Sequence, residues 1–228
     1  MDLFISPLSC SLAVHIACLE ADVPFRTHRV DRKTKHLDDG RDYRSIAPQG
    51  IVPAIRLPDG SILTETAALL QYIADLRPAT SLAPRWGTPE RYRLIEWIHF
   101  VGTELHKKHL WMVLSSKTSS EVKAFAASTA EPPLAHVARH LEASDRGPFL
   151  LGEDFTVADA YLFWALLVAP YAGIAIDHHP SLVSYVERGR ARPAVKKALG
   201  MEVPLYVSEQ GAIPPVPSPA KREATVTA

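Results

Sequence analysis

The first apolar positions of the chain form two short runs with a helical pattern between them. The runs at residues 2–5 (DLFI) and 25–30 (FRTHRV) have the length and the side chains that are typical of β-strands. Between them, three apolar residues recur at the spacing of one helix face: Leu12, Ile16 and Leu19. This pattern predicts a helix that ends near Asp22, and therefore a strand–helix–strand unit.

A second group of apolar runs predicts a β-hairpin followed by a helix. The runs IVPAIRL and SILT flank the sequence PDG at residues 58–60, which is a turn signal between two strands. From Glu65 the apolar residues again follow a helical spacing, which ends before Pro78. Residues 1–77 therefore predict an α/β domain with the element order βαβ-ββα.

The composition changes after residue 77, and no later segment predicts a convincing strand. Residues 78–88 are rich in Pro, Gly, Ser and Thr and predict a linker. Residues 89–200 predict an all-helical domain with helices at 89–115, 119–144, 156–172 and 181–199. Residues 201–228 contain five prolines and little periodicity, so we expect an extended, Pro-rich C-terminal tail.

One helix of this domain is expected in its centre. In FTVADAYLFWALLVA, Thr156 and Asp159 have the spacing of a capping box, in which the two side chains bond the first backbone N–H groups of a helix. The residues that follow are apolar all round. A helix with this pattern is buried on every side.

The charge balance removes several classes of partner. Lys and Arg together number 25, as do Asp and Glu, so no net field attracts the chain to nucleic acid or to an anionic membrane. The start, MDLFISPLSC, lacks the features of a signal peptide, and no segment reaches the roughly 20 apolar residues of a membrane span. We therefore expect a cytoplasmic protein that binds neither nucleic acid nor membrane.

Cys10 and Cys18 are the only cysteines of the chain. On one helix they would lie about 12 Å apart, whereas a disulfide needs Cα atoms within about 7 Å, so we expect both to be reduced. Cys10 stands where a helix begins, and there the free N–H groups and the helix dipole favour a thiolate, its own or that of a ligand. The alternative is that Cys10 is a small, buried apolar residue.

Two further short sequences suit an extended, peptide-like ligand. In GIVPAI, Pro53 at a strand start is a candidate for a cis peptide bond, which would turn the backbone groups of Val52 outward; the alternative is an ordinary trans proline. In TETAALL, Glu65 and Thr66 stand at a helix start, where they could hold the ammonium and carboxylate of an α-amino acid. The alternative is that they only cap the helix.

A polar stripe is expected on the first helix of the helical domain. His99, Thr103 and His106 recur at i, i+4 and i+7, which aligns them beside an apolar face. Such a stripe could line a cleft between the two domains. For each histidine alone, a solvated face is the alternative.

Other histidine patterns give no convincing metal site. His136 and His140 have i, i+4 spacing but lack the Glu of a zinc-protease helix and an obvious third ligand. The sequences HKKH and DHH are unsupported in the same way, so we expect no metal. The basic run RGRARPAVKK has no interleaved aromatic residues and is interpreted as a solvated helix face.

Taken in order, the segments SPLSCSLAVHIACLE, APQGIVPAI, DGSILTETAALLQYIADL and FTVADAYLF resemble the glutathione S-transferases, most closely the bacterial beta class. The resemblance covers about residues 1–200. It implies a thioredoxin-like domain that binds glutathione, an all-α domain that supplies much of the site for an electrophile, and a homodimer. The sequence departs from the family at Leu8, where a small residue is usual.

The resemblance also implies roles for single residues. Cys10 matches a cysteine that lies beside the glutathione sulfur and can form a mixed disulfide with it, and His106 is the second catalytic candidate. The glutathione-binding candidates are Lys35 near the glycyl carboxylate, Val52 and Pro53 at the cysteinyl portion, Glu65 and Thr66 at the γ-glutamyl end, and His99 and Lys107 on the helix that carries His106.

The expected function is that of a glutathione transferase, an enzyme that joins the glutathione thiolate to hydrophobic electrophiles in detoxification. Glutathione is then the co-substrate, and no metal takes part. One alternative is glutathione-dependent thiol–disulfide exchange or peroxidase chemistry through a Cys10 mixed disulfide. Another is a glutathione-binding protein without catalytic activity.

Overall fold

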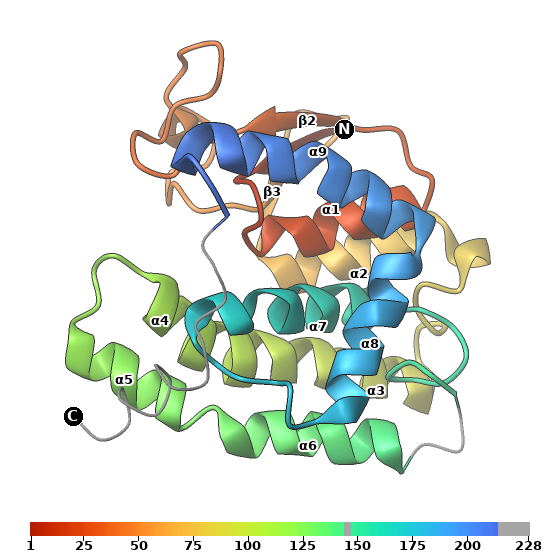
Figure 1. Cartoon of the computed structure of the whole chain (residues 1–228). Helices are drawn as coiled ribbons and strands as arrows, with labels where there is room; N and C mark the ends of the chain where they lie inside the picture. Colours follow the sequence, from red (N-terminus) through yellow and green to blue (C-terminus); the bar gives the residue numbers. More distant parts are fainter. Residues whose placement is uncertain (144–146, 214–228) are drawn as a thin grey trace.

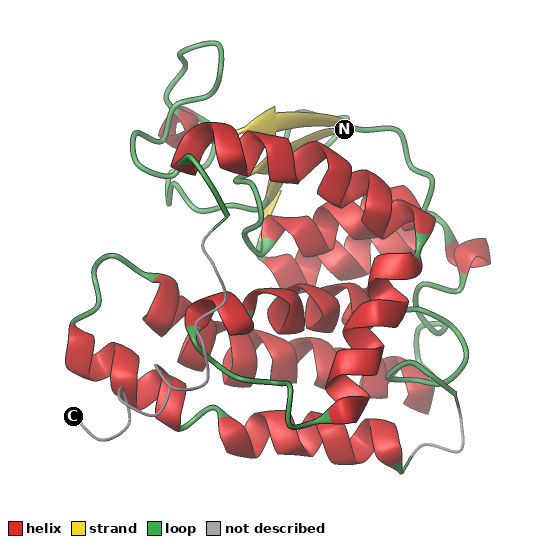
Figure 2. Cartoon of the chain, in the orientation of Figure 1, coloured by secondary structure: helices red, strands yellow, loops and turns green. Residues whose placement is uncertain are grey.

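The structure, a computed structural model, describes residues 1–143 and 147–213. Its strands lie together at one end of the molecule, and helices make up the rest, as Figure 1 and Figure 2 show. The element order of the N-terminal part is βαβ-ββα, which confirms the prediction of an α/β domain followed by a helical one.

The strands form one mixed sheet. β1 (Asp2–Ile5) pairs parallel with β2 (Arg26–Arg29) and antiparallel with β3 (Ala54–Arg56). β4 (Ile62–Thr64) pairs antiparallel with β3, so the strand order is β2-β1-β3-β4. The parallel pair requires a crossover, and the helix predicted between the two runs supplies it.

The two faces of β1 belong to different clusters of buried residues because successive side chains of a strand point in opposite directions. Leu3 and Ile5 pack in the main core with residues of the helices. Phe4 packs on the other face, in a smaller cluster that includes Val30 and Tyr43. One face of the sheet is therefore covered by helices and the other by the loops that follow β2.

The described helices run through both parts of the chain. The α-helices are α1 (Ser11–Glu20), α2 (Thr66–Leu76), α3 (Pro89–Phe100), α4 (Trp111–Leu114), α5 (Ser120–Ser128), α6 (Glu131–Glu142), α7 (Val157–Val168), α8 (Pro180–Ala191) and α9 (Pro193–Gln210). The short 3-10 helices are η1 (Tyr43–Ser45), η2 (Pro78–Thr80) and η4 (Pro170–Ala172). The remaining element, η3 (Val101–Leu110), is π-helical and joins α3 to α4 without a break.

Helix α7 is the centre of the helical part, as its sequence predicts. Every residue from Val157 to Val168 is buried, and the capping box between Thr156 and Asp159 is formed. The Asp159 carboxylate accepts hydrogen bonds from the Leu150 and Thr156 N–H groups and from the Tyr185 hydroxyl. Burial nevertheless raises the pKa of Asp159.

Two of the predicted helices are each divided in two by proline. The segment expected at 119–144 consists of α5 and α6, with prolines at 132 and 133 in the first turn of α6. The segment expected at 181–199 consists of α8 and the start of α9, which begins at Pro193. A proline has no N–H to donate to the preceding turn, so it starts a helix and cannot continue one.

The expectation of an extended tail from residue 201 is wrong for residues 201–210, because α9 continues to Gln210. Glu202 faces inward and is fully buried, and this acidic residue at a core position obscures the helical pattern of the sequence. Pro204 lies inside α9. The other four prolines lie beyond residue 213 and so outside the described residues.

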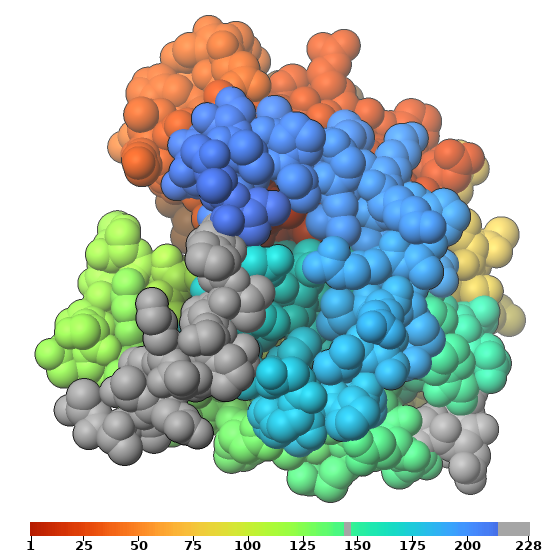
Figure 3. Space-filling model, viewed as in Figure 1, coloured from red at the N-terminus to blue at the C-terminus, as the bar shows by residue number. Residues whose placement is uncertain are grey.

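Helix α9 lies across the N-terminal part, as its blue atoms show in Figure 3, and packs against α1. Side-chain pairs join this end of the chain to the sheet and to α1: Arg192–Glu20 at 2.6 Å, Glu202–His15 at 2.8 Å and Glu209–Arg29 at 2.7 Å. The last helix is thus part of the fold around the start of α1. Among the described residues, no helix is long and apolar enough to cross a membrane.

Candidate functional site

A cavity of about 630 Å³ lies where the α/β part meets α3 and η3. Candidate residues from both parts of the chain line it: Cys10, Val52, Pro53, Glu65, Thr66, His99, His106 and Lys107. Lys35 is the candidate residue that is not part of the lining. The segments that the sequence analysis singled out separately therefore meet at one place.

Cys10 is at the N-terminal end of α1, as predicted, and is 9% exposed at the edge of the cavity. Its thiol donates a hydrogen bond to the carbonyl oxygen of Val52 at 3.6 Å. Burial raises the pKa of the Cys10 thiol, although Thr66 and the charge of Lys107 act in the opposite direction. For the protein by itself, burial is the largest influence on the pKa of the Cys10 thiol and opposes the thiolate, contrary to the expectation from the helix start.

The loop before Cys10 is held from two sides at Leu8, which has a φ of 56°. Its N–H donates to Glu202 Oε2 at 2.7 Å, and its carbonyl oxygen accepts from Trp164 Nε1 at 3.2 Å. Glu202 also bonds His15 Nδ1 at 2.8 Å, and both of these side chains are fully buried. Sequence reasoning missed Glu202 because its partners lie near the other end of the chain.

The Val52–Pro53 peptide bond is cis, which confirms the candidate geometry at this proline. Ile51, the residue before Val52, is held by Tyr43, whose hydroxyl donates to the Ile51 carbonyl oxygen at 3.0 Å. The Val52 carbonyl faces the Cys10 thiol across this edge of the cavity.

Glu65 and Thr66, at the N-terminal end of α2, line the cavity. Glu65 is exposed, has a φ of 68°, and makes no capping hydrogen bond with its side chain. Left-handed backbone at a residue other than glycine is costly and often marks a ligand-binding segment. Because Glu65 does not cap the helix, its carboxylate is available to a ligand, whereas Thr66 is 7% exposed and points toward Cys10 and Tyr161.

The polar stripe expected on the helix after residue 89 lines the cavity, since His99, Thr103 and His106 all contribute to it, although residues 101–110 are π-helical. In this segment the Trp111 N–H bonds the carbonyl of His106, five residues earlier. His106 is buried, at 6% exposed, while Lys107 remains exposed beside the cavity. π-Helical turns are rare and occur often at functional sites.

His106 forms a buried pair with Tyr161 of α7. Its Nδ1 atom is 2.7 Å from the Tyr161 hydroxyl oxygen, and its ring packs edge-on against Trp164. Burial lowers the pKa of His106 to about 3 and raises that of Tyr161, so both groups are neutral near pH 7. Sequence reasoning missed Tyr161, although a tyrosine in a helix buried on all sides must find a partner for its hydroxyl.

The other two candidate residues lie nearer to solvent. His99 is exposed at the cavity, and its Nδ1 donates to the carbonyl oxygen of Ile95 at 2.9 Å. Lys35 is partly buried, and burial together with the positive charges of Lys117, Arg32 and Arg44 lowers its pKa. The segment around Lys35 is thus a positive region outside the cavity lining.

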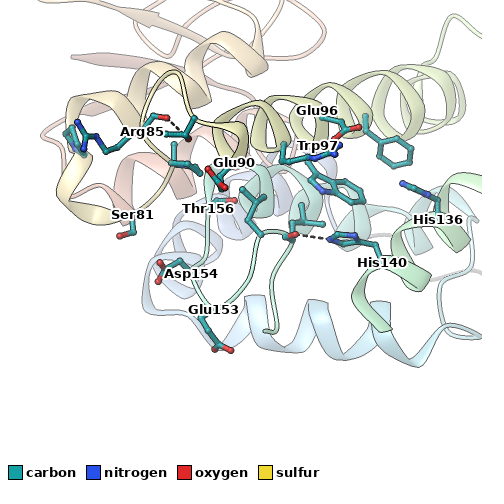
Figure 4. Close-up of a pocket in the computed structure, with 18 residues that line it drawn as sticks. Ser81, Arg85, Glu90, Glu96, Trp97, His136, His140, Glu153, Asp154 and Thr156 are labelled. Carbon is teal, nitrogen blue, oxygen red and sulfur yellow. Dashed lines mark hydrogen bonds and ion pairs between the residues drawn. The ribbon is translucent and has the colours of Figure 1, made fainter. Parts of the chain in front are cut away.

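A second cavity, of about 820 Å³, contains none of the candidate residues. It is lined by α3, α6 and the segment before α7, and Figure 4 shows Trp97 and His140 on one side of it. The ring centroids of these two residues are 4.5 Å apart, and His140 Nε2 donates to the carbonyl oxygen of Leu150. These side chains are engaged in packing, and we assign no chemistry to this cavity.

Protein-family models match both parts of the chain. The model described as Glutathione S-transferase, N-terminal domain matches residues 9–76, and the model described as Glutathione S-transferase, C-terminal domain matches residues 104–200. The first match contains Cys10, Val52 and Glu65, and the second contains His106.

Individual relatives match most of the chain. Glutathione S-transferase GstA of Escherichia coli O157:H7 is 36% identical over 202 residues, which cover 89% of this chain and 98% of the relative. The solved structure of the bacterial beta-class glutathione S-transferase of Sphingomonas chungbukensis has a TM-score of 0.83 and 40% identity. The match covers 89% of this chain and 98% of that protein. A sphingomonad glutathione S-transferase complexed with glutathione has a TM-score of 0.82 and 40% identity over the same shares.

Proposed function

This chain belongs to the glutathione S-transferase family, resembles its bacterial beta class and is an enzyme, and we propose that it joins the glutathione thiolate to hydrophobic electrophiles. The observation that carries this proposal is the cavity beside Cys10, because backbone and side chains suited to a peptide-like ligand converge on it from both domains. The glutathione complex of the sphingomonad relative supports glutathione as the co-substrate.

Glutathione would lie along the α/β side of the cavity with its sulfur beside Cys10. The exposed carboxylate of Glu65 attracts the ammonium of the γ-glutamyl end, and the Thr66 hydroxyl and the free N–H groups at the start of α2 bind its carboxylate. The backbone of Val52 and the Pro53 ring border the cysteinyl portion. These contacts are complementary in charge to a free α-amino-acid end.

The remaining contacts would come from Lys35 and from the helical domain. The positive region around Lys35 suits the glycyl carboxylate, which lies at the far end of an extended tripeptide. His99, His106 and Lys107 approach from α3 and η3 and close the cavity on the other side. Neutral His106 gives hydrogen bonding without a second charge.

In the proposed reaction the glutathione thiol loses its proton to solvent, and the sulfur then attacks an electrophilic carbon. A C–S bond forms, and the leaving group departs with its bonding electron pair. Lys107 and the N–H groups at the start of α1 favour the thiolate. An apolar electrophile fits against Ile98, Gly102 and Tyr161, which line the helical side.

The wider proposal follows the sequence analysis. Residues 1–77 form the glutathione-binding domain, residues 78–88 the linker, and residues 89–200 the domain that supplies the electrophile site. We propose that the enzyme works in the cytoplasm as a homodimer in detoxification. Light scattering of the purified chain measures the dimer directly.

The test of the proposed function is a conjugation assay with reduced glutathione and an activated aryl halide. We expect turnover that saturates in both substrates, and binding of reduced glutathione by calorimetry. Binding without conjugation or disulfide reduction, over a broad panel of electrophiles and disulfides, would instead establish a non-catalytic glutathione-binding protein. Absence of binding would reject the assignment of the cavity.

Thiol–disulfide exchange is a second candidate function because Cys10 reaches the cavity. Its thiolate would attack oxidised glutathione, forming a Cys10–glutathione disulfide and releasing one glutathione thiolate. Cys18 is free and fully buried, so it is not placed to resolve that disulfide, and a second glutathione would have to do so. Burial raises the pKa of the Cys10 thiol, which lowers the fraction of Cys10 present as the attacking thiolate.

A further inference from the structure

Three side chains with metal-binding atoms meet at the end of the molecule that lies opposite to the sheet in Figure 1, where α6 begins and α8 begins. Glu131, the first residue of α6, lies between His178 and His179, which precede α8. Glu131 Oε2 is 2.9 Å from His178 Nε2, and Glu131 Oε1 is 2.9 Å from His179 Nε2. These atoms all lie within 4.8 Å of one another.

This donor set is one that zinc prefers. Two imidazole nitrogens and one carboxylate oxygen, with water at the fourth position, form a common tetrahedral zinc site. Bond lengths of about 2.0 to 2.1 Å in a tetrahedron place neighbouring ligand atoms about 3.3 Å apart. In the structure the Glu131 oxygens lie 2.9 Å from the imidazole nitrogens, and no two of the ligand atoms are more than 4.8 Å apart, so small side-chain rotations would bring all three onto one ion.

The exposure of the three side chains and a nearby carboxylate also favour a bound cation. The side chains of Glu131 and His178 are 52% and 49% exposed, so a hydrated cation reaches them from solvent, and His179 at 17% is the anchored member. The Nδ1 atom of His178 is 3.9 Å from an Asp177 carboxylate oxygen. At that separation the carboxylate adds negative charge beside the cluster, which favours a bound cation.

We propose that Glu131, His178 and His179 bind one Zn²⁺ ion, completed by water, at a site separate from the glutathione cavity. From the sequence alone no metal is expected here, because DHH by itself has no third ligand. The third ligand comes from a helix that begins 47 residues earlier. The ion would join the start of α6 to the segment before α8, and the site lies apart from the glutathione cavity.

The test is calorimetric titration of the untagged full-length chain with Zn²⁺ in a buffer that does not chelate metal. We expect one ion per chain in wild type, and a loss of at least about tenfold in affinity in Glu131→Gln and in His178→Ala, since losing even an outer partner of a ligand costs that much. His136→Ala is the matched control, because His136 is an exposed histidine of α6 outside the cluster. Its affinity should equal that of wild type.

Substitution with Co²⁺ separates this site from the cysteines. The proposed site should give the visible bands of a tetrahedral ion without a sulfur charge-transfer band, and the bands should vanish in Glu131→Gln. Equal zinc affinity in wild type, Glu131→Gln and His178→Ala, a thiolate spectrum alone, or no binding at all would each overturn the proposal. Conjugation activity should be the same in all these variants, so a failure here leaves the proposed function unaffected.

A thermal melt gives an independent measurement of the same site. An ion that binds the folded chain raises the melting temperature in proportion to its binding free energy. We expect Zn²⁺ to raise the melting temperature of wild type and of His136→Ala, and a chelator to reverse the effect. A rise of the same size in His178→Ala would contradict the assignment.

Discussion

The carboxylate of Glu202 accepts a hydrogen bond of 2.7 Å from the backbone N–H of Leu8, although the two residues are 194 positions apart in the sequence. The bond fixes the loop that ends at Cys10. Its acceptor is fully buried and is shared with His15, so α9 holds the segment that presents the candidate nucleophile.

Replacement of Glu202 by Ala should strongly destabilise the fold. It leaves the Leu8 N–H and the His15 ring buried without their acceptor, and breaking a buried pair of this kind costs about 3 to 5 kcal/mol. Urea unfolding measures the loss. Glu202→Gln keeps an acceptor oxygen and should lose less; equal stability of Glu202→Ala and wild type would show that the pair contributes nothing.

Thr66→Ala should raise the KM for glutathione with little change in kcat. The hydroxyl is assigned to the γ-glutamyl carboxylate, and a hydrogen bond to a charged group contributes about 1.5 to 3 kcal/mol, which corresponds to a loss of about tenfold or more. Thr66→Ser keeps the hydroxyl and is the matched control. An unchanged KM in Thr66→Ala would remove this residue from the glutathione site.

Cys10→Ala should separate the two candidate chemistries. If Cys10 only adjoins the glutathione sulfur, conjugation is largely retained, whereas exchange through a mixed disulfide is abolished. Intact-mass analysis after treatment with oxidised glutathione detects the Cys10 adduct directly. Cys18→Ala is the control, since this fully buried thiol should not affect the adduct. Persistence of the adduct in Cys10→Ala would refute the assignment.

His106 should make the protein less stable in acid. Its pKa is about 3 in the folded chain and about 6.5 when unfolded, so the unfolded state binds more protons between these values. Above about pH 6.5 both states hold neutral His106, and the free energy of unfolding is unaffected by it. Between about pH 6.5 and pH 3 the free energy of unfolding falls by about 1.4 kcal/mol for each pH unit. Unfolding free energies of wild type and His106→Gln between pH 4 and 7 test this; parallel slopes would contradict it.

Two glycines of the last helices should respond in opposite directions to Ala. At Gly189 of α8 an added Cβ would overlap the ring of Phe163, including its Cε2 atom at 2.8 Å, and overpacking costs about 1 to 3 kcal/mol. At Gly200 of α9 an added Cβ would meet nothing within 4 Å beyond the helix's own backbone, so Ala should stabilise the helix by up to about 1 kcal/mol. Denaturant midpoints of the two variants measure both effects, and a stabilised Gly189→Ala would disprove the close packing.

The parts of the fold that were predictable are those coded by neighbouring residues. The runs DLFI, FRTHRV, IVPAIRL and SILT became the four strands, and Thr156 with Asp159 formed the expected capping box. Periodicity, turn residues and caps act over a few positions, so one sequence is enough to detect them. The motif order was equally informative, because it led to the family.

The features that were missed depend on distant contacts. From the sequence alone, Glu202 is interpreted as a surface acid, because its partners Leu8 and His15 lie far away in the chain. Tyr161 is interpreted as a core aromatic residue, because the sequence does not show that its hydroxyl bonds His106. The π-helical turns at residues 101–110 and the raised pKa of Cys10 also depend on how the two domains pack. Patterns among neighbouring residues do not show how distant segments pack.

The contact between Glu202 and Leu8 also sets an order for synthesis on the ribosome. The sheet and α1 are translated first, but the acceptor for the Leu8 N–H is made almost two hundred residues later. The nascent N-terminal domain therefore emerges with its cysteine loop lacking both of its partners at Leu8, Trp164 and Glu202. Only a chain translated through α9 can complete the loop, so messages cut short before that helix should yield no working product.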